Sequence, residues 1–418
     1  MDYSQARKYI DSLRTRGIVP GLESIKKLCE ALGNPQDNLR VIHIAGTNGK
    51  GSTGMFIESI LRSAGKNVFR FSSPAVGNYL EMFTINGKNA DENDYASCVE
   101  AIHKAEYDSR GSLSFTVFEA ETAAAFLLTN KYSPDYAIIE CGLGGRLDST
   151  NIIKDPILSV ITTISKDHTA FLGDTISEIT FEKCGIIKSK APVVSAAQQT
   201  EAENVIQKIC FEQNSKLSYI DIPHNINYCS TKTKFYLKNN QYSIRLLGSY
   251  QPQNAALAAK AAEALGIEHE YIHRGLKSAY IPYRFERIGS FILDGAHNPG
   301  AAKKLAESVK IYLNKGKTAF ICGVFKDKDY ESISEITAGL ADKVFTVSPP
   351  LPRGLDSAEL CEVFKNHGAD ALSCETMEKA INKATDGNYD NILIFGSLSI
   401  LDEAKKIIIS QNNERDQQ

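Results

Sequence analysis

The chain has 418 residues, of which 47 are Lys or Arg and 50 are Asp or Glu, so its formal net charge is −3. This balance argues against nucleic acid or a membrane surface as a partner, and the sequence contains no apolar run long enough to span a bilayer, so we expect a protein that acts on small molecules. The nine cysteines form no C-x-x-C pair, which argues against disulfides and a zinc site and predicts a cytoplasmic protein.

Short apolar runs alternate with longer amphipathic stretches along the first part of the chain. This alternation is typical of a mostly parallel sheet covered by helices. The predicted strands span residues 40–46, 67–74, 135–142 and 157–164, and the predicted helices span 21–35, 50–66, 114–130 and 175–188. We expect Thr175 to cap the last of these helices.

The pattern changes to a period of two between about Ser218 and Leu247, which predicts a small antiparallel hairpin region. Helices are predicted again at 252–265 and 270–279, and Pro282 then interrupts the helical pattern. Beyond residue 290, each predicted strand is followed by a helix, and these strands span 291–298, 318–325, 343–348 and 391–397. We therefore expect an α/β protein of two domains, a mostly parallel sheet domain over 1–288 and a smaller Rossmann-like domain over 289–418.

The sequence G-T-N-G-K-G-S after the first strand differs from the common phosphate-binding loop, G-x-x-x-x-G-K-[ST]. That pattern would place a glycine at position 44 and a hydroxyl at 51, where this chain has Ile44 and Gly51. The physical parts are still present, because glycines let backbone N–H groups approach phosphate oxygens and Lys50 supplies positive charge. A nucleotide-phosphate site is therefore predicted at Gly46, Thr47, Asn48, Gly49, Lys50, Gly51 and Ser52. The alternative is an ordinary glycine-rich turn between a strand and a helix.

Polar residues follow several of the predicted strands, where ligands bind in open α/β sheets. Ser73 follows the second strand, Glu140 ends the third and His168 follows the fourth. With Ser52, these side chains suit Mg²⁺, which also keeps water and phosphate oxygens as ligands. Taken alone, Ser73 could end a strand, Glu140 could be a solvated acid and His168 could be a capping or core residue. Their shared position at strand ends favours a magnesium site.

The sequence leaves a functional and a structural role open for three charged residues. Lys183 has apolar neighbours, which would lower its pKa and favour the neutral nucleophilic amine, but it could also be a surface lysine paired with Glu182 or Glu178. Arg284 and Asp294 lie near the predicted domain boundary. They could link nucleotide binding to domain closure, or they could form an interdomain ion pair.

These motifs together resemble the folylpolyglutamate synthase and dihydrofolate synthase family, within the Mur ligases. The resemblance covers nearly the whole chain, and it rests on the segments 38–53, 71–74, 115–126, 139–153, 161–188, 251–259, 283–286, 292–299 and 323–329. It implies a central domain of Mur ligase type and a glutamate-binding C-terminal domain. It also implies a monomeric, ATP-dependent ligase that joins L-glutamate to dihydropteroate or a reduced folate through an acyl phosphate.

The resemblance also implies roles for particular residues. Asn48 to Ser52 would hold the ATP phosphates, and Asn254, Arg284 and Asp294 would contact the nucleotide. Two Mg²⁺ sites are expected, served by Ser52, Ser73, Glu140, His168 and a carbamate that CO₂ forms on Lys183. The pterin site would be lined by Thr116, Val117, Phe118, Glu119, Leu147, Asp148 and Ser149. The glutamate cleft would include Asp294, His297 and Asn298, and the residues expected to act in catalysis are Lys50, Lys183, His168, Asp294 and His297.

The chain departs from the family pattern at Ser24, Ala75 and Met82, toward the expected pterin side, so the preferred acceptor stays open. Within the ligase class, the alternative is a Mur-type ligase acting on another carboxylate. Alternatives from other classes are a P-loop phosphotransferase or GTPase switch and an inactive binding protein. A cell-wall ligase would usually carry a nucleotide-sugar domain before the phosphate loop, and the roughly 45 residues here are too few for one. A phosphotransferase would be expected to keep the standard loop pattern, which this chain lacks.

Overall fold

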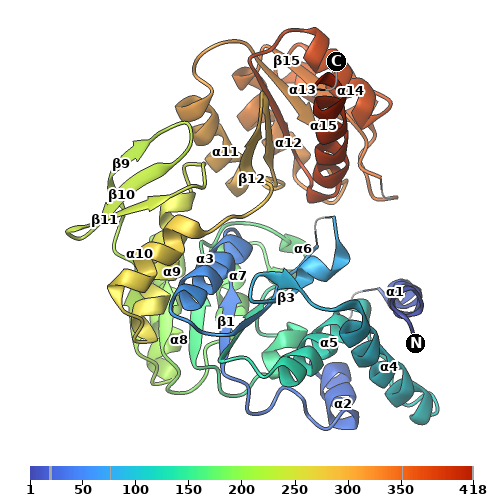
Figure 1. Ribbon diagram of the computed structural model, residues 1–418, viewed down its shortest axis with the longest axis vertical. Coiled ribbons are helices and arrows are strands. Elements are labelled where there is room, and N and C mark those ends of the chain that lie inside the picture. The colour runs from blue at the N-terminus through green and yellow to red at the C-terminus, as the bar shows by residue number, and fades with distance from the viewer. Residues whose placement is uncertain (18–20, 76, 351, 417–418) are drawn as a thin grey trace. The chain divides into compact units, whose positions relative to one another are not determined.

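The computed structural model describes residues 1–17, 21–75, 77–350 and 352–416 (Figure 1). The chain forms two compact units, one of Met1–Ile222 with Gln253–Ser278 and one of Pro223–Pro252 with Ala279–Gln418. The predicted domain division at 288/289 stays a prediction. In the compact units, the hairpin region and residues 279–288 group with the C-terminal part of the chain.

The first unit is built on an eight-stranded sheet in the order β4-β3-β2-β5-β1-β6-β7-β8. Its strands are β1 Val41–Ala45, β2 Val68–Phe71, β3 Phe83–Ile85, β4 Lys88–Asn89, β5 Tyr136–Glu140, β6 Leu158–Ile161, β7 Val193–Ser195 and β8 Leu217–Tyr219. The neighbouring strands β2, β5, β1, β6, β7 and β8 pair in parallel. The strands β3 and β4 add an antiparallel edge beside β2. Every residue of β1, β2, β5 and β6 is buried, which explains why these strands are almost continuously apolar.

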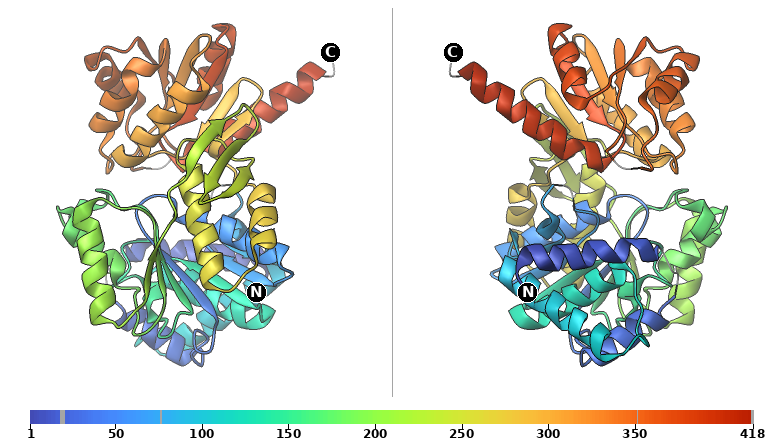
Figure 2. Two further views of the ribbon diagram at one scale, coloured as in Figure 1. Left: turned by 90° about the vertical axis from the view of Figure 1, so that its left-hand side faces the viewer. Right: turned by 90° about the vertical axis from the view of Figure 1, so that its right-hand side faces the viewer.

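Helices surround this sheet, and Figure 2 shows α1 and α4 lying side by side. They are α1 Tyr3–Ser12, α2 Glu23–Ala31, α3 Lys50–Ser63, α4 Glu92–Asp108, α5 Val117–Tyr132, α6 Thr169–Leu172, α7 Ile176–Cys184, α8 Thr200–Glu212, α9 Gln251–Ala264 and α10 His269–Ser278. The six helices predicted here are confirmed with shifted ends. Thr175 caps α7 as expected, accepting a hydrogen bond from the Glu178 backbone in a capping box.

The second unit contains two sheets. A three-stranded antiparallel sheet has the order β11-β10-β9, with β9 His224–Tyr228, β10 Thr233–Leu237 and β11 Asn240–Ile244. A six-stranded sheet has the order β12-β13-β17-β14-β15-β16, with β12 Arg284–Ile288, β13 Phe291–Asp294, β14 Thr318–Cys322, β15 Lys343–Thr346, β16 Ala371–Ser373 and β17 Asn391–Phe395. Only β12 runs antiparallel among the described strands of this larger sheet.

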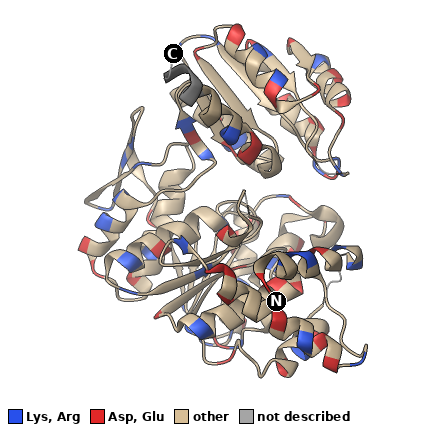
Figure 3. Cartoon of the chain, turned by 45° about the vertical axis from the view of Figure 1, so that its right-hand side comes forward, with Lys and Arg blue, Asp and Glu red and all other residues tan. Residues whose placement is uncertain are grey.

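The α-helices of the second unit are α11 Pro299–Tyr312, α12 Tyr330–Thr337, α13 Ser357–Asn366, α14 Met377–Asp386 and α15 Leu401–Asp416. Short 3₁₀ helices occur in both units, at η1 Leu13–Arg16, η2 Tyr79–Met82, η3 Ser149–Ile152, η4 Ala338–Leu340 and η5 Leu398–Ile400. The predicted fold class, two α/β units with mostly parallel main sheets, is therefore confirmed. Figure 3 shows basic and acidic residues interspersed along the helices of both units.

Apolar clusters cover the main sheet of the first unit. One includes Phe69, Phe71 and Phe126, and another includes Ile161 and Ile179. Each fully buried aliphatic or aromatic side chain of this kind contributes roughly 1.5–3 kcal/mol. In the part of the chain that the structure describes, no helix has the length and apolar character needed to cross a membrane.

Candidate active site

The strand order brings the predicted polar residues to one edge of the first sheet. The strand β1 lies between β5 and β6, and Ile44 pairs with Glu140 while Ala45 pairs with Ile161. Because these strands are parallel, the loops that follow them start side by side. The glycine-rich loop after β1 is therefore flanked by the segment after Glu140 and by the segment that leads to His168.

The conformation of the glycine-rich loop depends on its first two glycines, Gly46 and Gly49. Gly46 and Gly49 have φ angles of 149° and 90°. A Cβ atom at Gly46 would lie 1.9 Å from Thr162 Oγ1, and one at Gly49 would lie 2.5 Å from Asn254 Oδ1. Both positions therefore need glycine, and the loop leads into α3 so that the free backbone N–H groups of its first turn can bind an anion.

The loop is held in place by the segment after β6. The backbone N–H of Thr47 donates to Thr163 O at 2.9 Å, and the Thr47 hydroxyl donates to Ser165 O at 3.0 Å. The Ser165 N–H donates back to the same hydroxyl at 3.1 Å. These three hydrogen bonds tie the loop to the segment after β6, and the predicted nucleotide contact Asn254 lies beside Gly49.

Two lysines meet at this loop. Lys183 Nζ on α7 donates to Gly46 O at 3.0 Å, and Lys50 Nζ donates to the same oxygen at 3.2 Å and to Thr47 O at 3.3 Å. Lys183 is only 4% exposed, and its burial, with a smaller effect of Lys50, lowers its pKa to about 7. The surface-lysine alternative is therefore wrong. The two glutamates expected to pair with Lys183 have other partners, since Glu182 pairs with Arg146 at 2.8 Å and Glu178 belongs to the cap of α7.

The donors predicted for magnesium follow or end the strands at this sheet edge, with Glu140 as the last residue of β5 and Ser52 in the first turn of α3. Glu140 is buried, and a Cβ at Gly51 would lie 3.6 Å from its Oε2 atom, so the carboxylate faces the first turn of α3, which also carries Ser52. His168 forms the N-terminal cap position of α6, and Ser73 lies two residues beyond β2. Among the described residues, no group of three or more His, Cys, Asp or Glu could hold a metal ion. One carboxylate with hydroxyls fits Mg²⁺ when phosphate oxygens and water complete the shell, and it would not fit a metal held by protein ligands alone.

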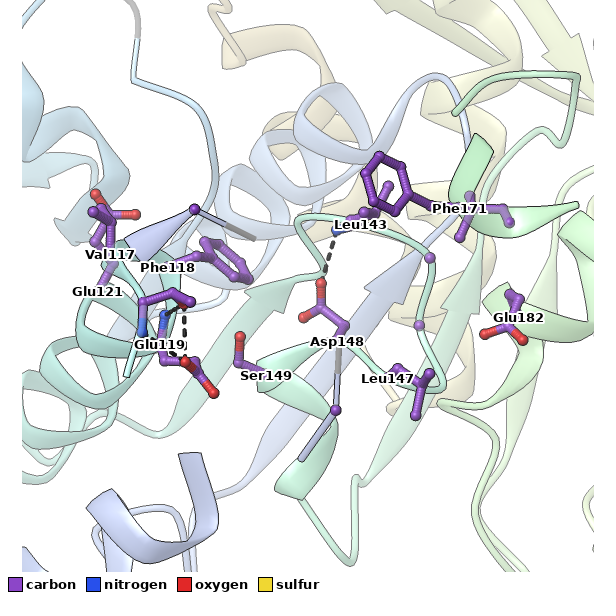
Figure 4. A pocket seen from close by; sticks show the side chains of 16 residues that line it. Val117, Phe118, Glu119, Glu121, Leu143, Leu147, Asp148, Ser149, Phe171 and Glu182 are labelled. Carbon is purple, nitrogen blue, oxygen red and sulfur yellow. Dashed lines mark hydrogen bonds between the residues drawn. The ribbon is translucent and has the colours of Figure 1, made fainter. Parts of the chain in front are cut away.

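A pocket lies beside this edge, and it brings both predicted pterin segments together (Figure 4). Its wall is formed by Gly17, Gly21, Thr116, Val117, Phe118, Glu119, Glu121, Leu143, Gly144, Gly145, Leu147, Asp148, Ser149, Phe171, Leu172 and Glu182. The sequence-based prediction of this wall did not include Gly17, Gly21, Glu121, Leu143, Gly144, Gly145, Phe171, Leu172 and Glu182. Glu121 lies four residues after Val117 on the same helix, and this spacing could have identified it.

The described residues of the pocket wall include four carboxylates but no Lys, Arg or His. Glu121 accepts a hydrogen bond from the Tyr79 hydroxyl at 2.7 Å, and burial raises its pKa to about 7. Burial also raises the pKa of Asp148, against hydrogen bonds that lower it. A pocket rich in hydrogen-bond acceptors favours a ligand group that is uncharged or cationic and carries N–H donors.

The remaining predicted residues cluster in the second unit, around the turn from β13 to α11. Asp294 is 3% exposed and accepts hydrogen bonds from the Tyr250 hydroxyl at 2.6 Å and from the Phe285 and Ala296 backbones at 2.9 Å. Arg284 lies nearby, because a Cβ at Gly295 would be 2.2 Å from its Nη1 atom. The next residues complete the turn: His297 Nδ1 lies 2.8 Å from Gly295 O, and Asn298 caps α11.

Both parts of the chain match domains of Mur ligases, and the chain is a Mur ligase. Residues 44–262 match the Mur ligase middle domain, and residues 283–398 match the glutamate ligase domain of Mur ligases. Within these ligases, the chain belongs to the family of dihydrofolate synthases and folylpolyglutamate synthases. It is 34% identical to the dihydrofolate synthase/folylpolyglutamate synthase of Bacillus subtilis, covering 97% of this chain and 98% of the relative. It is 30% identical to the Escherichia coli protein of the same name, covering 96% and 94%.

Solved structures agree with this assignment. Mycobacterium tuberculosis folylpolyglutamate synthase complexed with ADP matches with a TM-score of 0.90 and 27% identity, covering 97% of this chain and 98% of that one. E. coli FolC in complex with DHPP and ADP matches with a TM-score of 0.88 and 29% identity, covering 99% of both chains. The predicted family and the predicted enzyme class, an ATP-dependent ligase, are thereby confirmed. The roles of the individual site residues stay predictions.

Proposed function

We propose that the chain joins L-glutamate to the carboxylate of dihydropteroate or a reduced folate while ATP is cleaved to ADP and phosphate. The observation that carries this proposal is the position of the pocket. Its segment 143–149 follows β5, and β5 pairs directly with β1, which leads into the phosphate loop. An acceptor held in the pocket can thus extend a carboxylate toward a nucleotide at the loop.

The pocket chemistry supports a pterin. A pterin ring is uncharged at neutral pH and presents N–H donors along one edge, which Asp148 and the other carboxylates of the wall can accept. Apolar side chains offer contact to its flat faces, and Phe118 packs against Gly142, where a Cβ would lie 2.6 Å from its ring. The E. coli relative, whose solved structure contains DHPP and ADP, supports the same ligand class.

The nucleotide would be held by the loop residues Gly46 to Ser52, with Asn254 beside Gly49. Arg284 and Asp294 are proposed as further nucleotide contacts, and His297 and Asn298 as contacts of the incoming glutamate, on the strength of the family assignment. The ADP complexes of the relatives support ATP as the nucleotide.

Mg²⁺ would be bound by Ser52, Ser73, Glu140 and His168, and a second ion by a carbamate on Lys183. When bound, Mg²⁺ offsets negative charge on the triphosphate. The proposal for Lys183 is supported by its burial and lowered pKa, because CO₂ reacts with a neutral amine. The ammonium form first loses one proton to give the neutral amine; the amine nitrogen then bonds to the carbon of CO₂, the electrons of one C–O π bond move to oxygen, and the nitrogen loses a second proton, so that a cation becomes a carboxylate in all.

The reaction would proceed in two displacements. An oxygen of the acceptor carboxylate attacks the γ-phosphorus of ATP, the bond to the β–γ bridging oxygen breaks, and an acyl phosphate and ADP form. Lys50 offsets charge on the transferred group, and most of the rate enhancement comes from positioning. The glutamate amine then attacks the acyl carbon, phosphate leaves with its bonding electrons, and the nitrogen loses a proton to give the amide.

The experiment that tests this proposal compares ADP release with dihydropteroate and with tetrahydrofolate, each with ATP, Mg²⁺ and L-glutamate. Release with dihydropteroate alone would identify a dihydrofolate synthase, release with tetrahydrofolate alone a folylpolyglutamate synthase, and release with both a bifunctional enzyme. No ADP with either acceptor would refute the proposal.

We further propose that the enzyme acts as a cytoplasmic monomer on small molecules, without nucleic acid or a membrane as a partner. The small net charge supports this proposal, as do nine cysteines that are all free thiols. Light scattering on the purified protein tests the monomer, for which the expected mass is 45.9 kDa.

A further inference from the structure

Three buried polar side chains form a hydrogen-bonded chain behind the pocket. His43 lies on β1, Thr150 lies in η3 and Asp148 lies in the pocket wall. His43 Nε2 is 2.8 Å from Thr150 Oγ1, and Thr150 Oγ1 donates to Asp148 Oδ1 at 2.6 Å. His43 and Thr150 have no exposed surface, and Asp148 is 4% exposed.

The direction of these hydrogen bonds fixes the tautomer of His43. A threonine hydroxyl carries one proton, and because Thr150 donates that proton to Asp148, it must accept from His43. Burial lowers the pKa of His43 to about 3, so the ring is neutral and its proton lies on Nε2. The other ring nitrogen, Nδ1, has no hydrogen-bond partner among the described residues, which a buried acceptor tolerates better than a buried N–H group.

Asp148 connects this chain to the pocket loop. The Leu143 N–H donates to its Oδ2 atom at 2.8 Å, and the Thr150 N–H donates to its Oδ1 atom at 3.0 Å. A single carboxylate therefore ties together the two ends of the segment that forms this side of the pocket (Figure 4). Cys141 packs at the junction, with its Sγ atom 3.3 Å from His43 Nε2 and 3.4 Å from Thr150 Oγ1.

We propose that His43 and Thr150 are positioning residues for the acceptor, which fix Asp148 and the 143–149 segment so that the pterin binds in one orientation. This inference rests on the proposed function. The hydrogen bonds from His43 through Thr150 to Asp148 end at the pocket wall. Loss of these hydrogen bonds therefore weakens acceptor binding while leaving the phosphate loop in place.

The test compares Thr150→Val, which replaces the hydroxyl by a methyl group of similar size, with Thr150→Ser, which retains the hydroxyl. With the acceptor that the unmodified enzyme uses, we expect the KM for the acceptor to rise about tenfold or more in the valine variant. The KM for ATP and kcat should stay within about twofold, and serine should restore acceptor binding. An unchanged KM for the acceptor, or an equal loss of ATP affinity, would overturn the inference.

A second measurement needs no variant. In protein labelled with ¹⁵N-histidine, NMR should show His43 as a neutral ring protonated at Nε2 at pH 7. A proton on Nδ1, or a charged ring, would overturn the inference. An unmodified enzyme that releases no ADP with either acceptor would refute the proposed function itself, whereas an active enzyme with unchanged KM in Thr150→Val would refute only the positioning role.

Discussion

At the scale of single residues, Glu121 shows how burial in the pocket wall couples to stability. Its pKa in the folded protein is raised to about 7, chiefly by burial, whereas an unfolded chain restores an ordinary value of about 4.3. Between these two pH values the folded state binds more protons than the unfolded state. The contribution of Glu121 therefore becomes less favourable as pH rises from about 4.3 to 7, and the full penalty remains above pH 7.

We predict that Glu121→Gln stabilises the protein by about 3–4 kcal/mol at pH 8 and by only about 1 kcal/mol at pH 5. Glutamine can still accept the hydrogen bond of Tyr79, so the change removes the buried charge and little else. Urea unfolding of both proteins across this pH range measures the difference. Glu335→Gln on the exposed surface of α12 serves as the control, and a gain at position 121 that is the same at every pH would contradict the prediction.

Lys183 gives a second prediction at this scale, one that depends on the proposed carbamate. Lys183→Ala should lower turnover at least a hundredfold, because it removes the proposed carboxylate beside the phosphate loop. Formate or acetate should restore part of the activity by occupying the vacated space. Lys208→Ala, at a lysine with 76% side-chain exposure on α8, should leave ADP release unchanged. Normal turnover in Lys183→Ala would remove Lys183 from the mechanism.

At the scale of secondary-structure elements, two glycines near the start of α3 have different constraints, Gly49 at its N-terminal cap and Gly54 in its second turn. Gly49 has a positive φ angle and no room for a Cβ atom beside Asn254. Gly54 lies within α3, and a Cβ there would meet its nearest neighbours, Ile44, Ile138 and Arg70, at 3.5–3.7 Å, which is ordinary contact.

We therefore predict opposite outcomes for alanine at these two positions. Gly49→Ala should raise the KM for ATP at least tenfold, because the strained loop moves its N–H groups off the phosphates. Gly54→Ala should leave this KM unchanged and stabilise the protein by about 0.5–1 kcal/mol, as alanine is the better helix former. Steady-state kinetics measures the KM for ATP of both variants, and thermal unfolding measures their stability. An equal rise of this KM in Gly49→Ala and Gly54→Ala would contradict the proposed role of the loop.

Elements with strong local signals were predictable from sequence, and those with weak signals were not. The buried strands and the capped helix α7 were found because continuous apolar runs and a Thr-x-x-Glu box are local features. The helices α1 and α8 were missed because their apolar faces are narrow; α1 buries only Ala6 and Ile10, and α8 only Ala202, Ile206 and Cys210. The strands at 67–74 and 291–298 were predicted too long, since their polar ends belong to the loops.

The residues of the candidate site also include some that were predictable from sequence and some that were not. The segments 116–119 and 147–149 were assigned to one pocket through the family resemblance, and the structure places both in its wall. The chain from His43 to Asp148 could not be predicted, because it joins residues more than 100 positions apart whose contact depends on the pairing of β1 with β5.

At the scale of the whole molecule, the sequence does not indicate which unit the hairpin strands join. The alternation in β10 and β11 identifies strands with one buried face, but it carries no information on what covers that face. Within the second unit, Tyr312 at the end of α11 packs against this three-stranded sheet. Its hydroxyl lies 3.0 Å from Thr233 Oγ1, and its ring packs edge-on against Tyr228 and beside Phe285.

This contact predicts how the second unit responds to a single substitution. Tyr312→Ala should lower the free energy of unfolding of the second unit by about 2 kcal/mol, because it removes a half-buried ring and leaves Thr233 without this partner. Hydrogen exchange should then quicken in β9, β10 and β11 and in α11, while β1 and β5 of the first unit keep their protection. Tyr107→Ala, at a tyrosine 78% exposed on α4, should change neither. Faster exchange in the hairpin, β1 and β5 with unchanged protection of α11 would show that the hairpin unfolds with the first unit, and the grouping of residues 223–252 with the C-terminal part would be wrong.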